Sequence, residues 1–126
     1  MNILLMTDDL QLVQSIRRQL WRSDYDVDVI SARDHHFKCD LDRRYSLIIL
    51  DERLSGEGGK QVIERMRSHG VKSPVLMLTM LRQCVSSIVS VADAYLTRMF
   101  QRNDLVSNIQ ALIHSKEKAH VHEDKV

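Results

Sequence analysis

Three carboxylates and one hydroxyl stand just beyond short apolar runs of the sequence. Asp8 and Asp9 come after the run that ends at Met6, Asp51 comes after Leu50, and Thr79 ends a third run. Carboxylates gathered in one crevice repel each other, and a bound divalent cation is the least costly way to keep them ionised. Mg²⁺ suits such a site because it takes hard oxygen ligands and keeps positions for water or phosphate. Beside a cation and a hydroxyl, a carboxylate can act as the nucleophile in phosphoryl transfer, and we predict this role for Asp51.

Each of these residues also has an ordinary structural explanation. Aspartate is a favoured N-cap where a helix follows a strand, and Asp9 taken alone is best explained in that way. Asp51 alone is an ordinary polar residue at a strand end, and Thr79 alone is compatible with a turn. A carboxylate pair, a single carboxylate and a hydroxyl at the ends of three neighbouring strands are hard to attribute to coincidence. The combination therefore favours a functional site.

The apolar pattern predicts five strands that alternate with helices. Residues 3–6, 47–50 and 75–78 are continuous apolar runs, as expected of strands covered on both faces. Residues 25–29 alternate apolar side chains with aspartates, and residues 94–96 form a short run, so both are predicted to be edge strands. We predict an α/β fold, namely a doubly wound five-stranded parallel sheet of order 2-1-3-4-5, which is flavodoxin-like. Its ligand crevice should lie beyond the carboxyl ends of the central strands.

Between the strands, apolar residues recur at helical spacing, which predicts helices with one buried face. A second helix is expected within residues 34–44, where weak helix formers predominate. Gly70 is predicted to supply a left-handed cap after the third helix, before Pro74. The apolar faces of the first, third, fourth and fifth helices are, in order, Leu10, Val13, Ile16 and Leu20; Val62, Ile63 and Met66; Val85, Ile88 and Val89; and Leu105, Val106, Ile109, Leu112 and Ile113.

Length and composition indicate one domain in a reducing compartment. The chain has 126 residues, 44% of them hydrophobic, which is typical of a single soluble domain. Its formal net charge of +1 does not favour nucleic-acid binding by this domain itself. Cys39 and Cys84 lack metal-ligand spacing, and no apolar run approaches a membrane span, so we predict a cytoplasmic protein without a membrane partner. We expect a domain over residues 1–114 and a polar tail or linker over residues 115–126.

Four segments together resemble the receiver domains of bacterial two-component response regulators. They read ILLMTDD, YSLIILDERLSGEGG, SPVLMLT and ADAYLTRMF, in the order that this family shows, and the resemblance runs from residue 1 to residue 114. The resemblance implies a metal site made by Asp8, Asp9, Asp51 and the backbone carbonyl of Arg53, with Asp51 as the phosphoacceptor, Thr79 as the switch hydroxyl and Tyr95 as the aromatic that moves with it.

The same resemblance implies a signalling role rather than that of an enzyme. A histidine kinase or phosphotransfer protein would supply the phosphoryl group to Asp51, with Mg²⁺ as cofactor. The face formed by the fourth helix, the fifth strand and the fifth helix would then change and control an output domain or partner protein, including one that regulates transcription. The segment LVSNIQALI is most similar to the winged-helix branch of these regulators.

Several positions depart from the family pattern. Arg98 and Met99 stand where the family has Lys-Pro, so the cation is kept but a planar fork replaces a compact ammonium. A cis bond before Met99 would cost about 2.5 to 4 kcal/mol, so we predict a trans bond that redirects Arg98. Ser55 replaces a proline, and Met80 replaces a small residue. The segment from residue 79 to residue 98 is also shorter than usual by about one helical turn.

These departures keep a second function open, which is an interaction module that binds a partner without phosphorylation. Ala94 and Asn108 occupy positions that are usually Asp and Arg in winged-helix regulators, which predicts a monomer or a non-standard homodimer. A flavin-binding flavodoxin would share the strand order, but the acidic crevice would repel the flavin phosphate. Because the set of acidic residues is complete, we rank the phosphorylation switch ahead of the interaction module.

Overall fold

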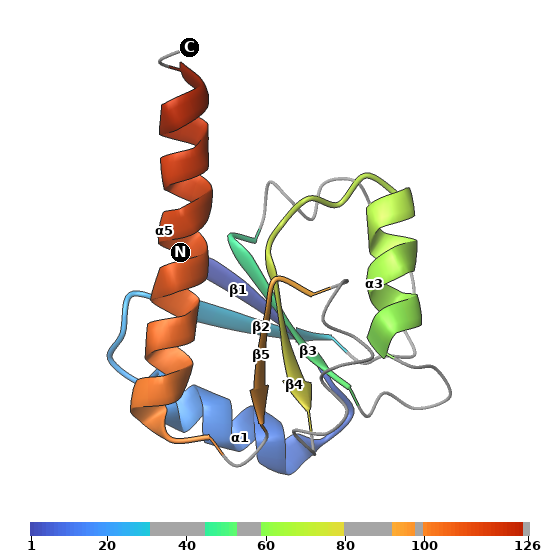
Figure 1. Ribbon diagram of the computed structural model, residues 1–126. Helices are drawn as coiled ribbons and strands as arrows, with labels where there is room; N and C mark the ends of the chain where they lie inside the picture. Colours follow the sequence, from blue (N-terminus) through green and yellow to red (C-terminus); the bar gives the residue numbers. More distant parts are fainter. Residues whose placement is uncertain (31–44, 53–58, 80–91, 98–99, 125–126) are drawn as a thin grey trace.

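A sheet of five parallel strands forms the centre of the described part of the chain (Figure 1). The computed structural model describes residues 1–30, 45–52, 59–79, 92–97 and 100–124, with side chains up to residue 114. The strand order is β2-β1-β3-β4-β5, as predicted. The strands are β1 (Asn2–Met6), β2 (Asp26–Ile30), β3 (Leu47–Asp51), β4 (Val75–Thr79) and β5 (Ala94–Thr97).

Burial along the strands separates the centre of the sheet from its edges. All residues of β3 and β4 are buried, and so is β1 after its first residue. In β2 exposed aspartates alternate with half-buried apolar residues, and every residue of β5 is half buried. Both edge-strand predictions are therefore confirmed. Continuous apolar runs fit the central positions because helices cover both faces of the sheet there.

The core consists of two apolar layers, one on each face of the sheet. Helices α1 (Leu10–Gln19) and α5 (Arg102–Asp124) cover one face, and α3 (Gly59–Ser68) covers the other (Figure 1). Successive residues of β1 alternate between the layers, with Leu4 and Met6 on the α3 side and Ile3 and Leu5 on the side of α1 and α5. This alternation is the normal result of strand pleating.

The buried face of α1 differs from the prediction at its first residue. Val13, Ile16 and Leu20 are buried as expected, but Leu10 is 76% exposed. Leu12, which the sequence analysis did not select, is buried instead. Leu10 opens the helix just beyond the end of β1 and belongs to neither apolar layer, so helical spacing alone did not determine its burial.

Helix α3 is tied to the strands that follow it by the side chain of Arg67. Its Nη1 donates hydrogen bonds to the carbonyl oxygens of Val71 and Ser73, both at 2.9 Å. Its Nη2 pairs with Asp93 Oδ2 at 3.2 Å, and the same oxygen accepts from the backbone N–H of Val75 at 2.8 Å. The turn between α3 and β4 contains Gly70 with φ +86°, which confirms the predicted left-handed cap.

We expect Arg67→Met to lower the free energy of unfolding by about 1 to 3 kcal/mol, because two backbone carbonyls lose their donor. Arg67→Lys should restore only part of this, since an ammonium cannot reproduce the fork. Lys60→Met, an exposed change in the same helix, should stay within about 0.5 kcal/mol. Urea denaturation followed by circular dichroism gives the comparison, and equal losses at Arg67 and Lys60 would contradict this role.

Helix α5 has the predicted apolar face and extends beyond it along the chain. Leu105, Ile109 and Ile113 are buried on one face, with Val106 and Leu112 packed at its margin. The helix continues to Asp124, so most of the segment expected to be a tail is helical, and it runs beyond the sheet at the end opposite to the strand arrowheads (Figure 1). The predicted domain boundary at His114 stays a prediction.

Two predicted helices, in residues 34–44 and around Val85, Ile88 and Val89, lie outside the described residues. Among the described helices, none is long and apolar enough to cross a membrane.

Candidate functional site

The carboxyl ends of β1, β3 and β4 bring the predicted functional residues to one edge of the sheet. Asp51 is the last residue of β3, and Thr79 is the last residue of β4. The register pairs Met6 with Leu50 and Asp51 with Leu78, so the three strands end at nearly the same level. Asp51 is only 1% exposed and Thr79 is fully buried. The predicted crevice therefore contains a buried carboxylate and a buried hydroxyl.

Thr7 is the residue beyond β1 that contacts Asp51. Its Oγ1 donates a hydrogen bond to Asp51 Oδ2 at 2.8 Å, and both side chains are buried. Thr7 was not predicted as a site residue, because acidic side chains alone were expected after this strand. A usable signal was present, since Thr7 directly follows the last residue of β1, just as a residue in the crevice should.

Asp9 is engaged at the start of α1. Its Oδ1 accepts from the backbone N–H groups of Gln11 and Leu12, at 3.0 and 3.4 Å, which is the geometry of an N-cap. The structural explanation offered for Asp9 is thus confirmed, and its role as a metal ligand stays a prediction. Asp8, its neighbour, is exposed.

The donors in the crevice fit Mg²⁺ in chemical type. Asp51 and Asp8 offer hard carboxylate oxygens, and the buried Thr79 hydroxyl adds a neutral oxygen nearby at the same sheet edge. However, the described residues include no group of three His, Cys, Asp or Glu side chains that could hold a metal ion. Arg53, whose carbonyl is the remaining predicted ligand, lies outside the described residues. The metal site of Asp8, Asp9, Asp51 and the Arg53 carbonyl therefore stays a prediction.

Thr79 Oγ1 has no hydrogen-bond partner in the described structure, although it is buried. A buried hydroxyl without a partner is costly, so such an atom usually marks a site where a ligand or a rearrangement satisfies it. Tyr95 on β5 is half buried against the apolar layer of α3, and its hydroxyl accepts from the backbone N–H of Ala92 at 3.0 Å. Tyr95 therefore lies half buried on the predicted edge strand, and its role as a switch residue stays a prediction.

The main departures from the family pattern fall outside the described residues. These are Ser55, Met80, Arg98 and Met99, so the predicted trans bond and the direction of Arg98 are not tested. Of the two positions considered for dimer contacts, Ala94 is half buried on β5. Asn108 is half buried and donates its side-chain amide to the carbonyl oxygen of Asp104 in its own helix, at 2.8 Å.

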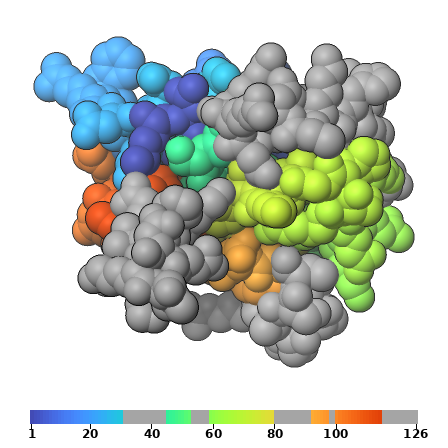
Figure 2. All heavy atoms as spheres, turned by 90° about the horizontal axis from the view of Figure 1, so that it is seen from above, coloured from blue at the N-terminus to red at the C-terminus, as the bar shows by residue number. Residues whose placement is uncertain are grey.

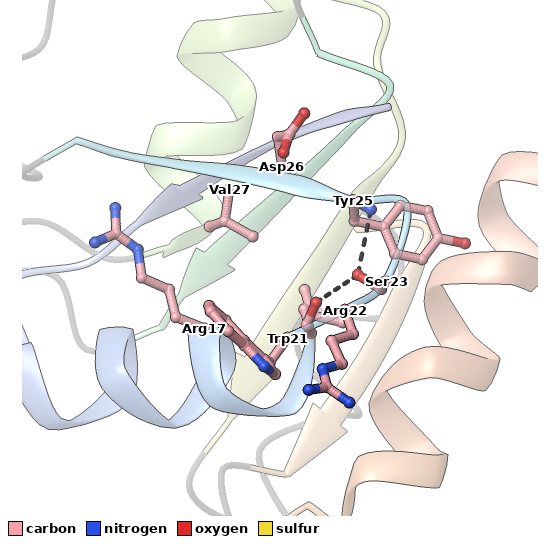
Figure 3. Close-up of a pocket in the computed structure, with 8 residues that line it drawn as sticks. Arg17, Trp21, Arg22, Ser23, Tyr25, Asp26 and Val27 are labelled. Carbon is pink, nitrogen blue, oxygen red and sulfur yellow. Dashed lines mark hydrogen bonds between the residues drawn. The ribbon is translucent and has the colours of Figure 1, made fainter.

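A separate pocket of 340 Å³ lies at the opposite end of α1, far from Asp51 along the helix. Arg17, Trp21 and Arg22 extend along it, and Val27 of β2 points toward them, whereas Asp26 points away (Figure 3). The light-blue atoms of the turn after α1 protrude at one corner of the molecule (Figure 2). Arg22 adopts φ 65°, an uncommon value for a residue other than glycine. The pocket lining includes a single carboxylate, that of Asp26, and Ser23 Oγ there donates a hydrogen bond to Leu20 O.

The chain has a doubly wound parallel sheet with a buried aspartate at the end of its third strand, and comparison with known proteins identifies its family. The family model of the response regulator receiver domain matches residues 3–110. The chain therefore belongs to the response regulator receiver domain family.

Two curated relatives of this chain are named as transcriptional regulatory proteins. It is 29% identical to the transcriptional regulatory protein TctD of Salmonella typhimurium over 129 residues, which cover 98% of the chain and 56% of TctD. It is 27% identical to the transcriptional regulatory protein DltR of Streptococcus agalactiae over 113 residues, which cover 87% of the chain and 50% of DltR. The chain thus spans about half the length of these relatives.

Among solved structures, the receiver domain of the sensor histidine kinase PA1611 from Pseudomonas aeruginosa shares the fold. The TM-score is 0.70 at 22% sequence identity, with 90% of this chain and 97% of that chain covered. That structure is described with a magnesium ion coordinated in its active-site cleft.

Proposed function

We propose that this receiver domain accepts a phosphoryl group on Asp51 from a histidine kinase or phosphotransfer protein. The observation that carries the proposal is the position of Asp51, a buried carboxylate at the carboxyl end of the central strand β3. Ligands of doubly wound sheets bind at this edge. Membership of the receiver family supports the same role.

In the proposed reaction, one carboxylate oxygen of Asp51 attacks the phosphorus atom of a phosphohistidine. The oxygen–phosphorus bond forms as the nitrogen–phosphorus bond breaks, and the imidazole leaves with the bonding electron pair. Little covalent chemistry beyond this displacement is needed, so positioning and charge neutralisation determine the rate. Burial aids positioning, because a buried carboxylate is held in a defined direction.

We propose Mg²⁺ as the cofactor, held by Asp51 and Asp8, with Asp9 and the carbonyl of Arg53 as the further predicted ligands. When bound, the ion would neutralise charge on the phosphoryl oxygens. Arg98 is proposed to add positive charge to the same site. A receiver with magnesium in its cleft has the same fold as this chain, which supports the assignment.

Thr79 and Tyr95 are proposed to transmit phosphorylation to the surface. The Thr79 hydroxyl is buried and without a partner in the described structure, so it is available to donate to a phosphoryl oxygen. Tyr95 lies on the neighbouring strand β5, whose register places Leu78 opposite Leu96 and Thr79 opposite Thr97. Movement of Thr79 would then alter the face around β5 and α5. We propose that this face controls an output domain or partner protein, through a monomer or a non-standard homodimer.

The test is to incubate the chain with Mg²⁺ and acetyl phosphate, and to measure the intact mass over time. We expect the gain of one phosphoryl group per chain, dependent on Mg²⁺ and reversed by hydroxylamine, which cleaves acyl phosphates. Absence of any labelled species at millimolar donor would contradict the proposal.

An interaction module that works without phosphorylation is the alternative. Two observations favour it: the Thr7 contact with Asp51, and the absence of any group of three potential metal-binding side chains among the described residues. A chain that binds its output partner with equal affinity before and after treatment with acetyl phosphate would support this alternative.

A further inference from the structure

Thr7 is fixed in the crevice by three hydrogen bonds of its own backbone and side chain. Its backbone N–H donates to Ile30 O of β2 at 3.2 Å, which anchors the main chain just after β1. Its Oγ1 accepts from the backbone N–H of Asp9 at 3.1 Å and donates to Asp51 Oδ2 at 2.8 Å. With an exposed fraction of 3%, the side chain has little access to water as a competing partner.

The direction of these bonds follows from the chemistry of the groups. A backbone N–H can only donate, and an ionised carboxylate can only accept. The Thr7 hydroxyl must therefore accept from Asp9 and direct its single proton at Asp51. Because Asp9 caps α1, its N–H lies at the positive end of the helix, so the hydroxyl links the helix start to the buried carboxylate.

We infer that Thr7 is a positioning residue that holds Asp51 in the resting state and competes with a divalent cation for its Oδ2 oxygen. A proton directed at a carboxylate lone pair and a cation on that lone pair exclude each other. The Thr7 hydroxyl thus supplies part of the stabilisation of the Asp51 carboxylate that a cation would otherwise give. This inference deepens the proposed function, because it concerns the carboxylate proposed there as phosphoacceptor.

The consequence is that Thr7 sets the affinity of the crevice for Mg²⁺. Asp9 is engaged as the helix cap, and the described residues offer no group of three metal-binding side chains. A hydroxyl in the buried position beside Asp51 therefore leaves the cation fewer charged ligands than a carboxylate there would. Removing the hydroxyl should strengthen cation binding. The Asp51 carboxylate then loses one hydrogen-bond donor, so a bound cation stabilises its negative charge by a larger amount.

The test is a calorimetric titration of the whole chain with Mg²⁺ alone, without any phosphodonor. We expect Thr7→Val to bind Mg²⁺ at least about fivefold tighter than the parent, and Thr7→Asp about tenfold tighter or more, because it adds a charged ligand. Thr7→Ser keeps the donor and should bind like the parent. Thr97→Val makes the same chemical change on the half-buried edge strand β5 and should also leave the affinity unchanged.

Folding of each variant is checked by circular dichroism, and Thr7→Ala replaces Thr7→Val if the valine variant is unfolded. Weaker binding in Thr7→Val, or equal affinity across all variants, would overturn the inference. So would an absence of binding that extends to Thr7→Asp. Failure of the parent chain to gain a phosphoryl group, with the expected order of Mg²⁺ affinities intact, would remove the proposed function and leave the positioning role of Thr7 standing.

Discussion

Asp51→Asn will abolish labelling of the chain by acetyl phosphate in the presence of Mg²⁺. Asparagine has the shape of aspartate but lacks the anionic oxygen that attacks phosphorus, and the side-chain carbonyl can still accept from Thr7. The fold should be retained, because the asparagine can still accept the buried hydrogen bond that Thr7 Oγ1 donates to Asp51 Oδ2 at 2.8 Å. Intact mass spectrometry measures the outcome, with an expected loss of labelling to the background level.

A matched control uses an aspartate outside the crevice. Asp26 begins the edge strand β2 and is exposed, so Asp26→Asn should be labelled as fast as the parent. Labelling of the Asp51→Asn variant at the parental rate would assign the phosphoryl group to another residue. Equal loss in both variants would point to an effect of charge on the whole chain rather than on the site.

The second large effect is expected on stability, in the central strand β1. Leu5 is fully buried in the layer between the sheet and α1, so Leu5→Ala leaves a cavity in a close-packed region. We expect a loss of about 2 to 5 kcal/mol in the free energy of unfolding. Since a domain of this size is stable by only about 5 to 15 kcal/mol, this change removes a large part of the free energy of unfolding. Urea denaturation followed by far-ultraviolet circular dichroism measures it.

Leu10→Ala provides the comparison with identical chemistry. Leu10 is 76% exposed, so its truncation should change the free energy of unfolding by no more than about 0.5 kcal/mol. If the two leucines proved equally costly, the exposed position of Leu10 at the start of α1 would be wrong, and the face predicted from helical spacing would be right.

The strands and their order were predictable because parallel sheets impose strong constraints on sequence. A strand covered on both faces must be apolar throughout, and residues 47–50 and 75–78 satisfy that condition. The aspartates of β2 are tolerated only where one side of a strand lacks a neighbour. The positions of Asp51 and Thr79 were predictable for a related reason, since the carboxyl ends of such strands meet at one edge.

Other features depend on contacts that spacing does not encode. Leu10 and Leu12 are both compatible with an apolar face, and only the position where β1 ends decides which one is covered. The residue that contacts Asp51 was not predicted from chemical type. The Asp9 carboxylate caps α1, and the Thr7 hydroxyl occupies the buried position beside Asp51. The helical extension of α5 beyond residue 114 was not predicted, because Lys and Glu favour helices without forming an apolar face that would reveal one.

The exposed turn after α1 has a spectroscopic consequence. Trp21 is the single tryptophan of the chain and is 71% exposed in the folded state. Its indole is already surrounded largely by water, so its emission maximum should lie near that of the unfolded chain, and acrylamide should quench it without prior unfolding. Intrinsic fluorescence will therefore be nearly silent as a measure of denaturation, whereas it will report on any molecule that covers this corner of the protein.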